Sequence, residues 1–141
     1  MRKAMLAAAA LVSASCSGAV ADGLTDAEVV YRTLYAECRG EAPAGQRAVA
    51  SVVWNRAALG GKTVRAVCLA RRQFSCWNKG AVQVAGSEIP ALRRLAAEIV
   101  DGGFRASGPW THYYNPAKCR PAWADKLTEA AVIGRHRFGV L

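Results

Sequence analysis

The chain has 141 residues and a formal net charge of +9, from 19 Lys and Arg against 10 Asp and Glu. This length fits one domain. Hydrophobic residues make up 52% of the chain and charged residues 21%, which excludes a disordered polyelectrolyte. After the N-terminus no apolar run approaches the ~20 residues of a membrane span, so a polytopic membrane protein is also excluded. We expect a small, basic, globular domain.

The first 21 residues have the pattern of a secretory signal peptide. Two basic residues at 2–3 are followed by an apolar stretch over 4–12, and Ala-Val-Ala at 19–21 is a small-x-small cleavage sequence. The sequence therefore predicts a signal peptide over 1–21. The mature protein is then periplasmic or secreted, with no stable membrane insertion after cleavage.

A lipidated cysteine is the alternative interpretation of this segment. Cys16 also follows small residues, but Ser13 stands three positions before it, where a lipoprotein signal has a large aliphatic residue. We therefore favour cleavage after Ala21 and a single mature domain over 22–141.

Four cysteines remain after cleavage. In an oxidising compartment an even number of cysteines predicts disulfides, with three possible connectivities. The short spacing between Cys68 and Cys76 favours that pair and leaves Cys38 with Cys119. A zinc site is the alternative, but the sequence has no C-x-x-C pair and no H-x-x-x-H. We expect no metal and no cofactor.

Two helices are predicted at the start of the domain. A capping box at 25–28 begins the first helix, which ends near Cys38, before Gly40. A proline in the first turn begins the second helix, over 43–59. This second helix is apolar around most of its circumference, which indicates the buried centre of the domain.

A narrow polar stripe interrupts the second helix. Arg47, Ser51 and Asn55 recur every four positions and therefore share one face. The stripe is either a solvated edge or a wall of a cleft.

Shorter elements follow. In chain order we expect a short helix over 63–70, an irregular segment over 73–77, a helix from a capping Ser87 to Val100, a strand or extended loop over 111–115, one or two helical turns over 121–127, and a hairpin of 130–133 with 136–140. The predicted fold class is mainly α (α+β), with a small C-terminal β element.

Glu37 is a carboxylate on the apolar face of the first helix, in the same sector as Val30 and Leu34. It is either paired with an arginine, such as Arg39 or Arg47, or lies on the floor of a cleft. Desolvation disfavours the charged form of a carboxyl group. A carboxyl group that keeps its proton near neutral pH can protonate a glycosidic oxygen as a general acid.

Several short motifs occur in one order along the chain. They are Glu37-Cys38-Arg39-Gly40-Glu41, Gly45-Gln46, Ala48-Val49-Ala50, Asn55-Arg56, Val67-Cys68, Gln73-Phe74-Ser75-Cys76-Trp77, Thr111-His112-Tyr113-Tyr114-Asn115, Pro121-Ala122-Trp123 and Ile133-Gly134-Arg135-His136-Arg137-Phe138. In this order they resemble the SleB/CwlJ-like cell-wall hydrolases, of the spore cortex-lytic enzyme type. The resemblance covers nearly all of the predicted mature domain.

The resemblance implies a lysozyme-like helical domain that cuts the glycan strands of peptidoglycan. The family's catalytic glutamate is the first of its E-x-R-G-E motif, which falls on Glu37. The chain departs from the family pattern at Cys38, where a small residue is usual, and at Gly139, where an aromatic residue often follows the last phenylalanine. Cys38 fits the predicted bridge to Cys119.

The sequence offers no obvious second carboxylate for a two-carboxylate glycosidase. Glu41 lies beyond Gly40, which is expected to break the helix between the two glutamates. We therefore expect a lytic transglycosylase with a single glutamate that cleaves between N-acetylmuramic acid and N-acetylglucosamine. A hydrolytic muramidase using the same site and a non-catalytic wall-binding or inhibitor protein are the alternatives.

Aromatic and polar residues of two motifs are predicted to bind the sugars. These candidates are Gln73, Phe74, Ser75, Trp77, Thr111, Tyr113, Tyr114 and Asn115. We assign Trp54 and Trp123 to the core and a structural role to His136. The expected partner is peptidoglycan, bound by a monomer. Nucleic acid is not an expected partner, because no basic cluster is interleaved with aromatic residues.

Two other enzyme classes remain as alternatives. A thiol peptidase would use Cys38 as its nucleophile with His112 or His136 as the base, although the C-terminal end of a helix disfavours a thiolate. A zinc amidase would need both histidines and a third ligand such as Glu37.

Overall fold

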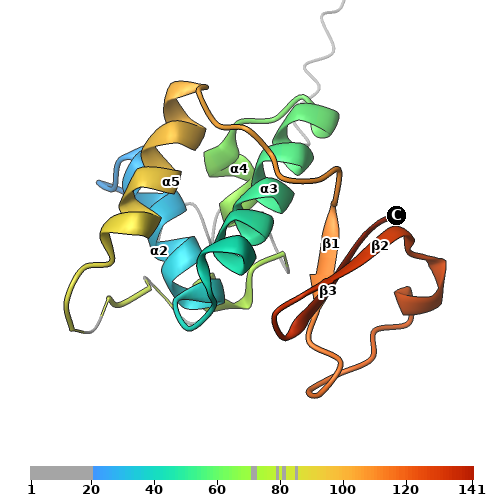
Figure 1. The fold of residues 1–141 in the computed structure, drawn as a ribbon. Coiled ribbons are helices and arrows are strands. Elements are labelled where there is room, and N and C mark those ends of the chain that lie inside the picture. Colours follow the sequence, from blue (N-terminus) through green and yellow to red (C-terminus); the bar gives the residue numbers. More distant parts are fainter. Residues whose placement is uncertain (1–20, 71–72, 79, 81, 85) are drawn as a thin grey trace, which may run out of the picture.

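The computed structural model has a helical part and a small sheet on either side of one central helix (Figure 1). It describes residues 21–70, 73–78, 80, 82–84 and 86–141. The elements are α2 (Asp26–Cys38), α3 (Pro43–Gly60), α4 (Val64–Leu69), the 3₁₀ turn η1 (Ser75–Trp77), α5 (Pro90–Asp101), β1 (His112–Tyr114), the 3₁₀ turn η2 (Ala124–Lys126), β2 (Thr128–Ile133) and β3 (His136–Val140). This order confirms the mainly α class with a small C-terminal β element.

The start of the chain is described only from Ala21, so the predicted signal peptide lies outside the described residues except for that one position. Ala21 is buried, and its carbonyl accepts hydrogen bonds from Leu24 N and Arg65 Nη2, both at 3.0 Å. Within the described ranges, none of the helices combines the length and apolarity that a bilayer span requires.

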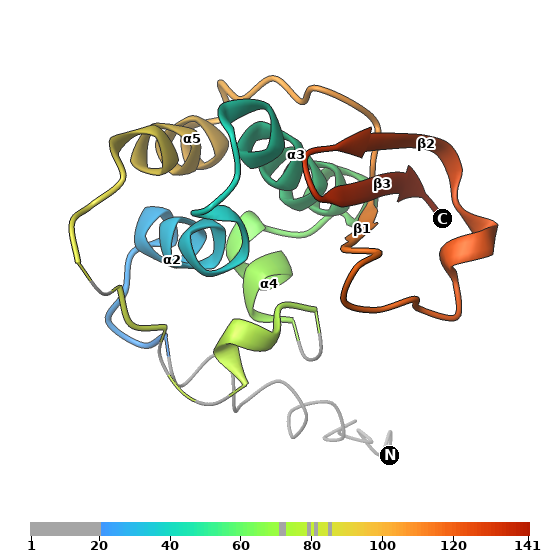
Figure 2. The same cartoon turned by 60° about the horizontal axis from the view of Figure 1, so that its bottom comes forward.

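Helix α3 is the centre of the domain, as its apolar sequence predicts. Pro43 occupies its first turn, and Gly61 ends it in the left-handed conformation with φ 58°. The helix contacts α2, α4 and α5 on one side and β1 and β2 on the other (Figures 1 and 2). Its position therefore fixes how the helical part and the sheet lie relative to each other.

The polar stripe of α3 is neither a solvated edge nor a cleft wall. Its side chains bind the segment that leads from α5 to β1. The hydrogen bonds are Arg47 Nη1 to Arg105 O (2.8 Å), Ser107 N to Ser51 Oγ (2.9 Å), and Asn55 Nδ2 to Gly108 O (2.9 Å) and Trp110 O (2.8 Å). The stripe thereby holds an irregular segment that has no secondary structure of its own, and it delivers β1 to its place beside α3.

The sheet has the strand order β1-β3-β2, with both pairs antiparallel. The predicted hairpin of β2 and β3 is confirmed, although β2 begins earlier than expected, at Thr128, and has an irregular register between Thr128 and Ala131. The sequence did not predict that β1 pairs with β3, with Tyr113 opposite Phe138. This pairing fixes the direction of the β1 side chains.

Helix α5 begins later than the sequence suggested. Ser87 was the expected N-cap, but the helix begins at Pro90, with Ile89 in the N-cap position. A residue before proline is pushed out of the helical region, and Ile89 is extended at φ −108° and ψ 99°. Proline at the first position therefore sets the start of α5, and the serine does not.

The structure contradicts the predicted disulfides, because all four cysteines that were expected to pair are free thiols. Cys38 is buried at the end of α2, where its Sγ donates to Leu34 O at 3.1 Å, whereas Cys119 is exposed in the loop between β1 and η2. Burial raises the pKa of both Cys68 and Cys76 to about 12, so these two thiols stay protonated.

A buried hydrogen bond supports the segment around η1. Trp77, 2% exposed, donates from Nε1 to Thr33 Oγ1 at 2.9 Å, and the Thr33 hydroxyl in turn donates to Val29 O at 2.8 Å. Thr33 itself is fully buried within α2. The pair therefore ties the segment containing η1 to the face of α2.

Replacing Thr33 with Val keeps the shape of the side chain and leaves the Trp77 indole N–H buried without an acceptor. We expect the free energy of unfolding to fall by about 1–3 kcal/mol, measured by urea denaturation. The matched control is Thr128→Val on the exposed start of β2, which should change it by less than about 0.5 kcal/mol. Equal losses in the two variants would contradict the assigned role of the Thr33–Trp77 bond.

Candidate active site

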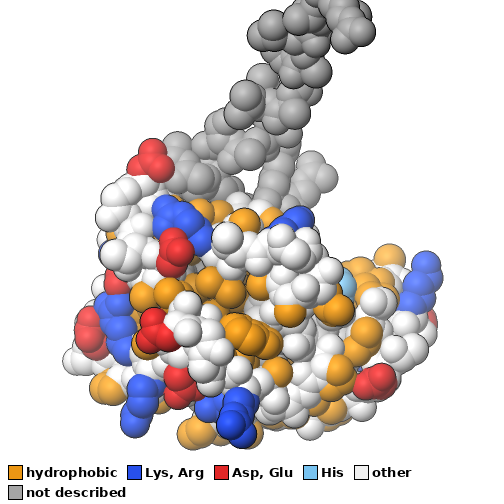
Figure 3. Space-filling model, turned by 90° about the horizontal axis from the view of Figure 1, so that it is seen from above, with side chains coloured by type: hydrophobic (Ala, Val, Ile, Leu, Met, Phe, Trp, Pro, Cys, Tyr) orange, Lys and Arg blue, Asp and Glu red, His pale blue; other side chains and the backbone are white. Residues whose placement is uncertain are grey.

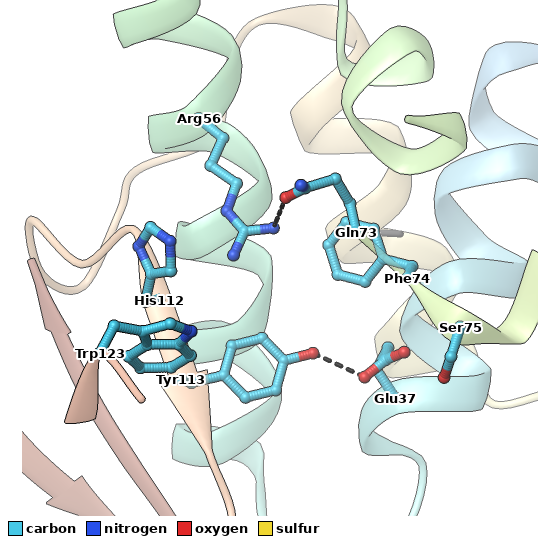
Figure 4. Close-up of a pocket in the computed structure, with 8 residues that line it drawn as sticks. All are labelled: Glu37, Arg56, Gln73, Phe74, Ser75, His112, Tyr113 and Trp123. Carbon is cyan, nitrogen blue, oxygen red and sulfur yellow. Dashed lines mark hydrogen bonds between the residues drawn. The ribbon is translucent and has the colours of Figure 1, made fainter. Parts of the chain in front are cut away.

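A cavity of about 310 Å³ lies between the end of α2, α3 and the sheet (Figure 4). This volume is in the range of small-ligand sites. The lining residues are Glu37, Arg56, Gln73, Phe74, Ser75, His112, Tyr113 and Trp123. Four separate parts of the chain thus contribute to one site: α2, α3, the segment that enters η1, and the β1–η2 region.

Glu37 lies in this cavity, on the penultimate residue of α2. The predicted alternatives were an ion pair and a place on the floor of a cleft. Among the described residues Glu37 has no ion pair, since Arg39 lies over the ring of Tyr35 and Arg47 lies 3.5 Å from Glu98. The carboxyl group is therefore available to a molecule that enters the cavity.

Tyr113 holds the Glu37 carboxyl group from the opposite wall. Its hydroxyl donates to Glu37 Oε2 at 2.7 Å (Figure 4). Burial and the neighbouring Glu37 raise the pKa of the Tyr113 hydroxyl well above its usual range, so this hydroxyl remains a donor. The Tyr113 ring is itself fixed, because it stacks on Phe138 at a centroid distance of 5.5 Å and meets the edge of His136 at 5.4 Å.

Arg56 connects three walls of the cavity. From α3 its Nε donates to Thr111 O at 2.6 Å and its Nη1 donates to Gln73 Oε1 at 3.0 Å, while the guanidinium lies 5.6 Å from the centroid of the Phe74 ring. The side chain is half-buried, and burial lowers the pKa of the guanidinium. Even a lowered arginine pKa leaves the group charged near neutral pH, so the cavity contains a fixed cation.

His112 is the other titratable group beside Arg56. Its Nδ1 lies 2.9 Å from Thr111 Oγ1, and its ring meets that of Trp123 at a centroid distance of 5.1 Å. Burial, followed by the positive charge of Arg56, lowers the pKa of the imidazole. The ring is therefore neutral near pH 7 and can exchange hydrogen bonds with a ligand without adding charge.

Glu41 lies outside the cavity and ties α2 to the β2–β3 turn. Its side chain is 10% exposed, and its Oε1 lies 3.4 Å from both Arg135 Nε and His136 Nδ1. Gly134 in the turn has φ 57°, and a Cβ built there would lie 2.8 Å from Glu41 Oε2. The second glutamate of the motif, Glu41, therefore supports the β2–β3 turn. His136 contacts both Glu41 and the ring of Tyr113, so it connects this support to the cavity.

The predicted sugar-binding residues divide into two groups. Gln73, Phe74, Ser75 and Tyr113 line the cavity. The other four do not. Trp77 is buried against Thr33, Thr111 is buried beneath Arg56 and His112, Tyr114 packs on Trp123, and Asn115 Oδ1 accepts from Ala117 N at 3.0 Å. These four support the lining residues.

Three lining residues were not predicted as binding groups: Arg56, His112 and Trp123. Trp123 was assigned to the core, but it is half-buried and lines the cavity. Two sequence signals could have indicated the others. Arg56 stands one position after the polar stripe of α3, and His112 immediately precedes Tyr113 within one shared motif.

The thiol-peptidase alternative is contradicted by the position of Cys38. This thiol is 2% exposed, does not line the cavity and has a pKa raised by burial and by the neighbouring Glu37 and Glu41. For the zinc alternative, the described part of the chain contains no group of three His, Cys, Asp or Glu side chains that could hold a metal ion. His112 lines the cavity, whereas His136 contacts Glu41.

The fold and the site together define a helical domain with an acid in its cleft. The profile of the Cell Wall Hydrolase family matches residues 40–139, so the chain belongs to this family. The match begins three residues after Glu37. A spore cortex-lytic enzyme of Oceanobacillus iheyensis is 30% identical over 115 residues, which are 80% of this chain and 41% of that protein. A spore cortex-lytic enzyme of Halalkalibacterium halodurans is 30% identical over 117 residues, 80% of this chain and 34% of that protein.

Two solved structures have the same fold over more than four fifths of this chain. The catalytic domain of the germination-specific lytic transglycosylase SleB from Bacillus anthracis superimposes with a TM-score of 0.67 at 26% identity, over 84% of this chain and 98% of that one. The catalytic domain of Bacillus cereus SleB gives a TM-score of 0.64, also at 26% identity, over 81% and 88%. The chain thus matches the extent of the SleB catalytic domains and spans about a third to two fifths of the length of the curated relatives.

Replacing Gly134 with Ala should destabilise the domain, because the new Cβ meets Glu41 Oε2 and the left-handed backbone disfavours a side chain. We expect the single variant to lose about 1–2 kcal/mol of unfolding free energy. In a Glu41→Ala background the loss should be smaller by about 0.5–1 kcal/mol, because the steric contact is gone. Urea denaturation of the four proteins of this cycle measures the coupling. If the two substitutions change the free energy of unfolding additively, Glu41 makes no steric contact with a side chain at position 134.

The His112 imidazole should titrate below the ordinary histidine value of about 6.5. Burial and the Arg56 charge both disfavour the imidazolium, so Arg56→Gln should raise the pKa of His112 toward that value. The measurement is an NMR titration of the histidine ring protons, with His112→Gln to assign the resonance. A His112 resonance that titrates at or above about 6.5 in the unaltered protein would contradict this account of the cavity.

Proposed function

We propose that this chain is a peptidoglycan lytic transglycosylase that cleaves between N-acetylmuramic acid and N-acetylglucosamine, with Glu37 as its one catalytic carboxyl group. The names of its relatives support this activity, since they include spore cortex-lytic enzymes and a lytic transglycosylase catalytic domain. Because the chain matches only part of the curated relatives, the substrate and the product are proposals for this protein.

The observation that carries the proposal is that the described lining of the cavity contains a single carboxyl group. Glu37 is the one Asp or Glu among the described lining residues. Glu41, the nearest in sequence, has its carboxylate on Arg135 and His136 of the hairpin. Glycosidases that hydrolyse through two carboxylates hold them about 5–9.5 Å apart across the scissile bond. With one carboxyl group, the same residue must act first as acid and then as base.

The bond from Tyr113 decides which oxygen of Glu37 carries the proton. Because Oε2 accepts the Tyr113 hydrogen, the proton to be transferred lies on Oε1. Oε1 has no hydrogen bond to any described residue, so it is free to approach the glycosidic oxygen. Proton transfer from Oε1 breaks the bond between muramyl C1 and that oxygen, and the bonding electron pair leaves with the oxygen.

The second half of the reaction returns the proton to Glu37. The Glu37 carboxylate accepts the proton of the muramyl C6 hydroxyl as O6 attacks C1, which closes a 1,6-anhydro ring without water. Tyr113 stabilises the carboxylate between the two steps, because a hydrogen bond to a charged acceptor is stronger than one to a neutral acceptor. The acid is then ready for another cycle.

The other lining residues are proposed to hold the sugars. Phe74 and Trp123 contribute aromatic rings to the lining, while Gln73 and Ser75 carry groups that can bond N-acetyl and hydroxyl substituents. Hydrolysis at the same site remains the second candidate function, because water could replace the C6 hydroxyl at C1.

We also propose that residues 1–21 are a signal peptide and that 22–141 act as an exported monomer. Peptidoglycan lies outside the cytoplasmic membrane, so an enzyme that cleaves it must cross that membrane. The basic start, the apolar stretch and the small-x-small sequence support this proposal.

Replacing Glu37 with Gln should abolish cleavage of purified sacculi, because an amide accepts the Tyr113 bond but cannot transfer the proton. We expect the rate to fall at least about 10²-fold, with unchanged thermal stability. Liquid chromatography with mass spectrometry of the released muropeptides measures both rate and product. The unaltered protein should yield 1,6-anhydromuramyl ends, which are lighter than hydrated ends by one water.

The control is Glu98→Gln, which removes a carboxylate from α5 outside the cavity and should cleave like the unaltered protein. If Glu37→Gln cleaves at the unaltered rate, Glu37 is not the acid. If the unaltered protein releases only hydrated muramyl ends, the protein is a muramidase.

A further inference from the structure

We propose that Arg56 is a carboxylate-binding residue of the cleft, which holds an acidic group on the muramyl side of the glycan strand while Glu37 acts on the glycosidic bond. This inference rests on the proposed function and extends it from the bond that is cut to the chemical group that selects the substrate.

The geometry leaves part of the guanidinium free for a ligand. Nε and one N–H of Nη1 are used by Thr111 and Gln73. Nη2 has no hydrogen bond to any residue of the described ranges, and in Figure 4 it points toward Tyr113 and the cavity. The outer edge formed by Nη1 and Nη2 is the fork with which arginine binds carboxylates through two parallel hydrogen bonds.

Among the described residues, no carboxylate forms an ion pair with the Arg56 guanidinium. Across the described part, the arginines within 4.0 Å of a carboxylate are Arg32, Arg47, Arg65, Arg93, Arg120 and Arg135. Some of these pairs, such as Arg32 with Glu28, are themselves half-buried, and on the face shown in Figure 3 acidic and basic side chains are interspersed. Within the described ranges, Arg56 is half-buried without a carboxylate at this distance, although removing a charge from water without a partner is costly.

The state of Glu37 at the start of the reaction increases this imbalance. While Glu37 holds the proton that it will transfer, Arg56 is the charged side chain of the described lining, because His112 is neutral near pH 7 and Tyr113 keeps its hydroxyl proton. With Glu37 protonated, the described lining carries the positive charge of Arg56. An anionic ligand restores neutrality, and a neutral sugar does not.

Peptidoglycan strands carry carboxylates in two places. The lactyl ether of each muramyl residue ends in a carboxyl group that is free when no peptide is attached, and the peptide stems carry carboxylates of their own. Both sources are attached to the muramyl residue, and both offer the same group to Arg56. N-acetylglucosamine carries no such group, so the contact would also distinguish the two sugars across the bond.

The test compares charged and neutral forms of the same strands. Stem-free glycan strands with free lactyl carboxylates are compared with the same strands after carbodiimide coupling to ammonia, which converts each carboxylate to an amide. Stem-bearing sacculi, untreated and amidated in the same way, form the second pair. For the unaltered protein we expect KM to be about tenfold higher on the amidated member of a pair, as a lost charge-assisted bond predicts.

Variants assign the preference to Arg56. Arg56→Gln should cleave charged and amidated strands with equal KM, and Arg56→Lys, which keeps the charge without the fork, should keep part of the preference. Arg94→Gln removes the same charge from an exposed position on α5 and should keep the whole preference. A merely structural role would lower activity on both members of a pair and leave their ratio unchanged.

Each outcome has one meaning. A preference on stem-free strands identifies the lactyl carboxylate, and a preference confined to stem-bearing sacculi identifies a stem carboxylate. Equal KM values on both pairs for the unaltered protein would overturn the inference while cleavage itself upholds the proposed function. A preference that persists in Arg56→Gln would also overturn it. Failure of the unaltered protein to cleave any of the four substrates would instead overturn the proposed function.

Discussion

The hydrogen bond from Tyr113 to Glu37 joins the two parts of the domain at the acid. One partner lies at the end of a helix and the other on a short strand, 76 residues apart in the sequence. The strand has no stability alone; its pairing with β3 and the stacking of Tyr113 on Phe138 fix it. The sheet therefore positions the Tyr113 hydroxyl beside the Glu37 carboxyl group. Helix α3 contacts both α2 and β1 and so fixes the separation of these two elements.

Local rules predicted most of the fold. The capping box before α2, the proline and glycine that bound α3, and the apolar circumference of α3 are signals within one element, and each gave an element close to the observed one. Glu37 could be singled out for the same reason, as a carboxylate on an apolar helical face. The pairing of β1 with β3 could not be predicted this way, because it depends on contacts between distant segments and on the polar stripe that delivers β1 to α3.

Sequence patterns also did not identify every residue of the site, because the position of these residues depends on contacts between distant segments. Arg56 is one arginine among many in the sequence, and only the tertiary fold shows that it is half-buried between Thr111 and Gln73. Counting cysteines likewise ignores where each one lies. The sequence pairs Cys38 with Cys119 by elimination. In the structure Cys38 is buried at the end of α2, whereas Cys119 is exposed in the loop between β1 and η2.

The contacts of Arg56 also determine when the cleft can form. The hydrogen bonds from Arg56 to Gln73 and to Thr111 join residues that are 17 and 55 positions apart in the sequence. The bond from Tyr113 to Glu37 joins residues that are 76 positions apart. Contacts of such long range form late, since their loop-closure entropy must be overcome first. During synthesis Glu37 leaves the ribosome before Tyr113, because it precedes Tyr113 by 76 residues. The cleft is therefore incomplete until the last quarter of the chain, which contains Tyr113, has folded.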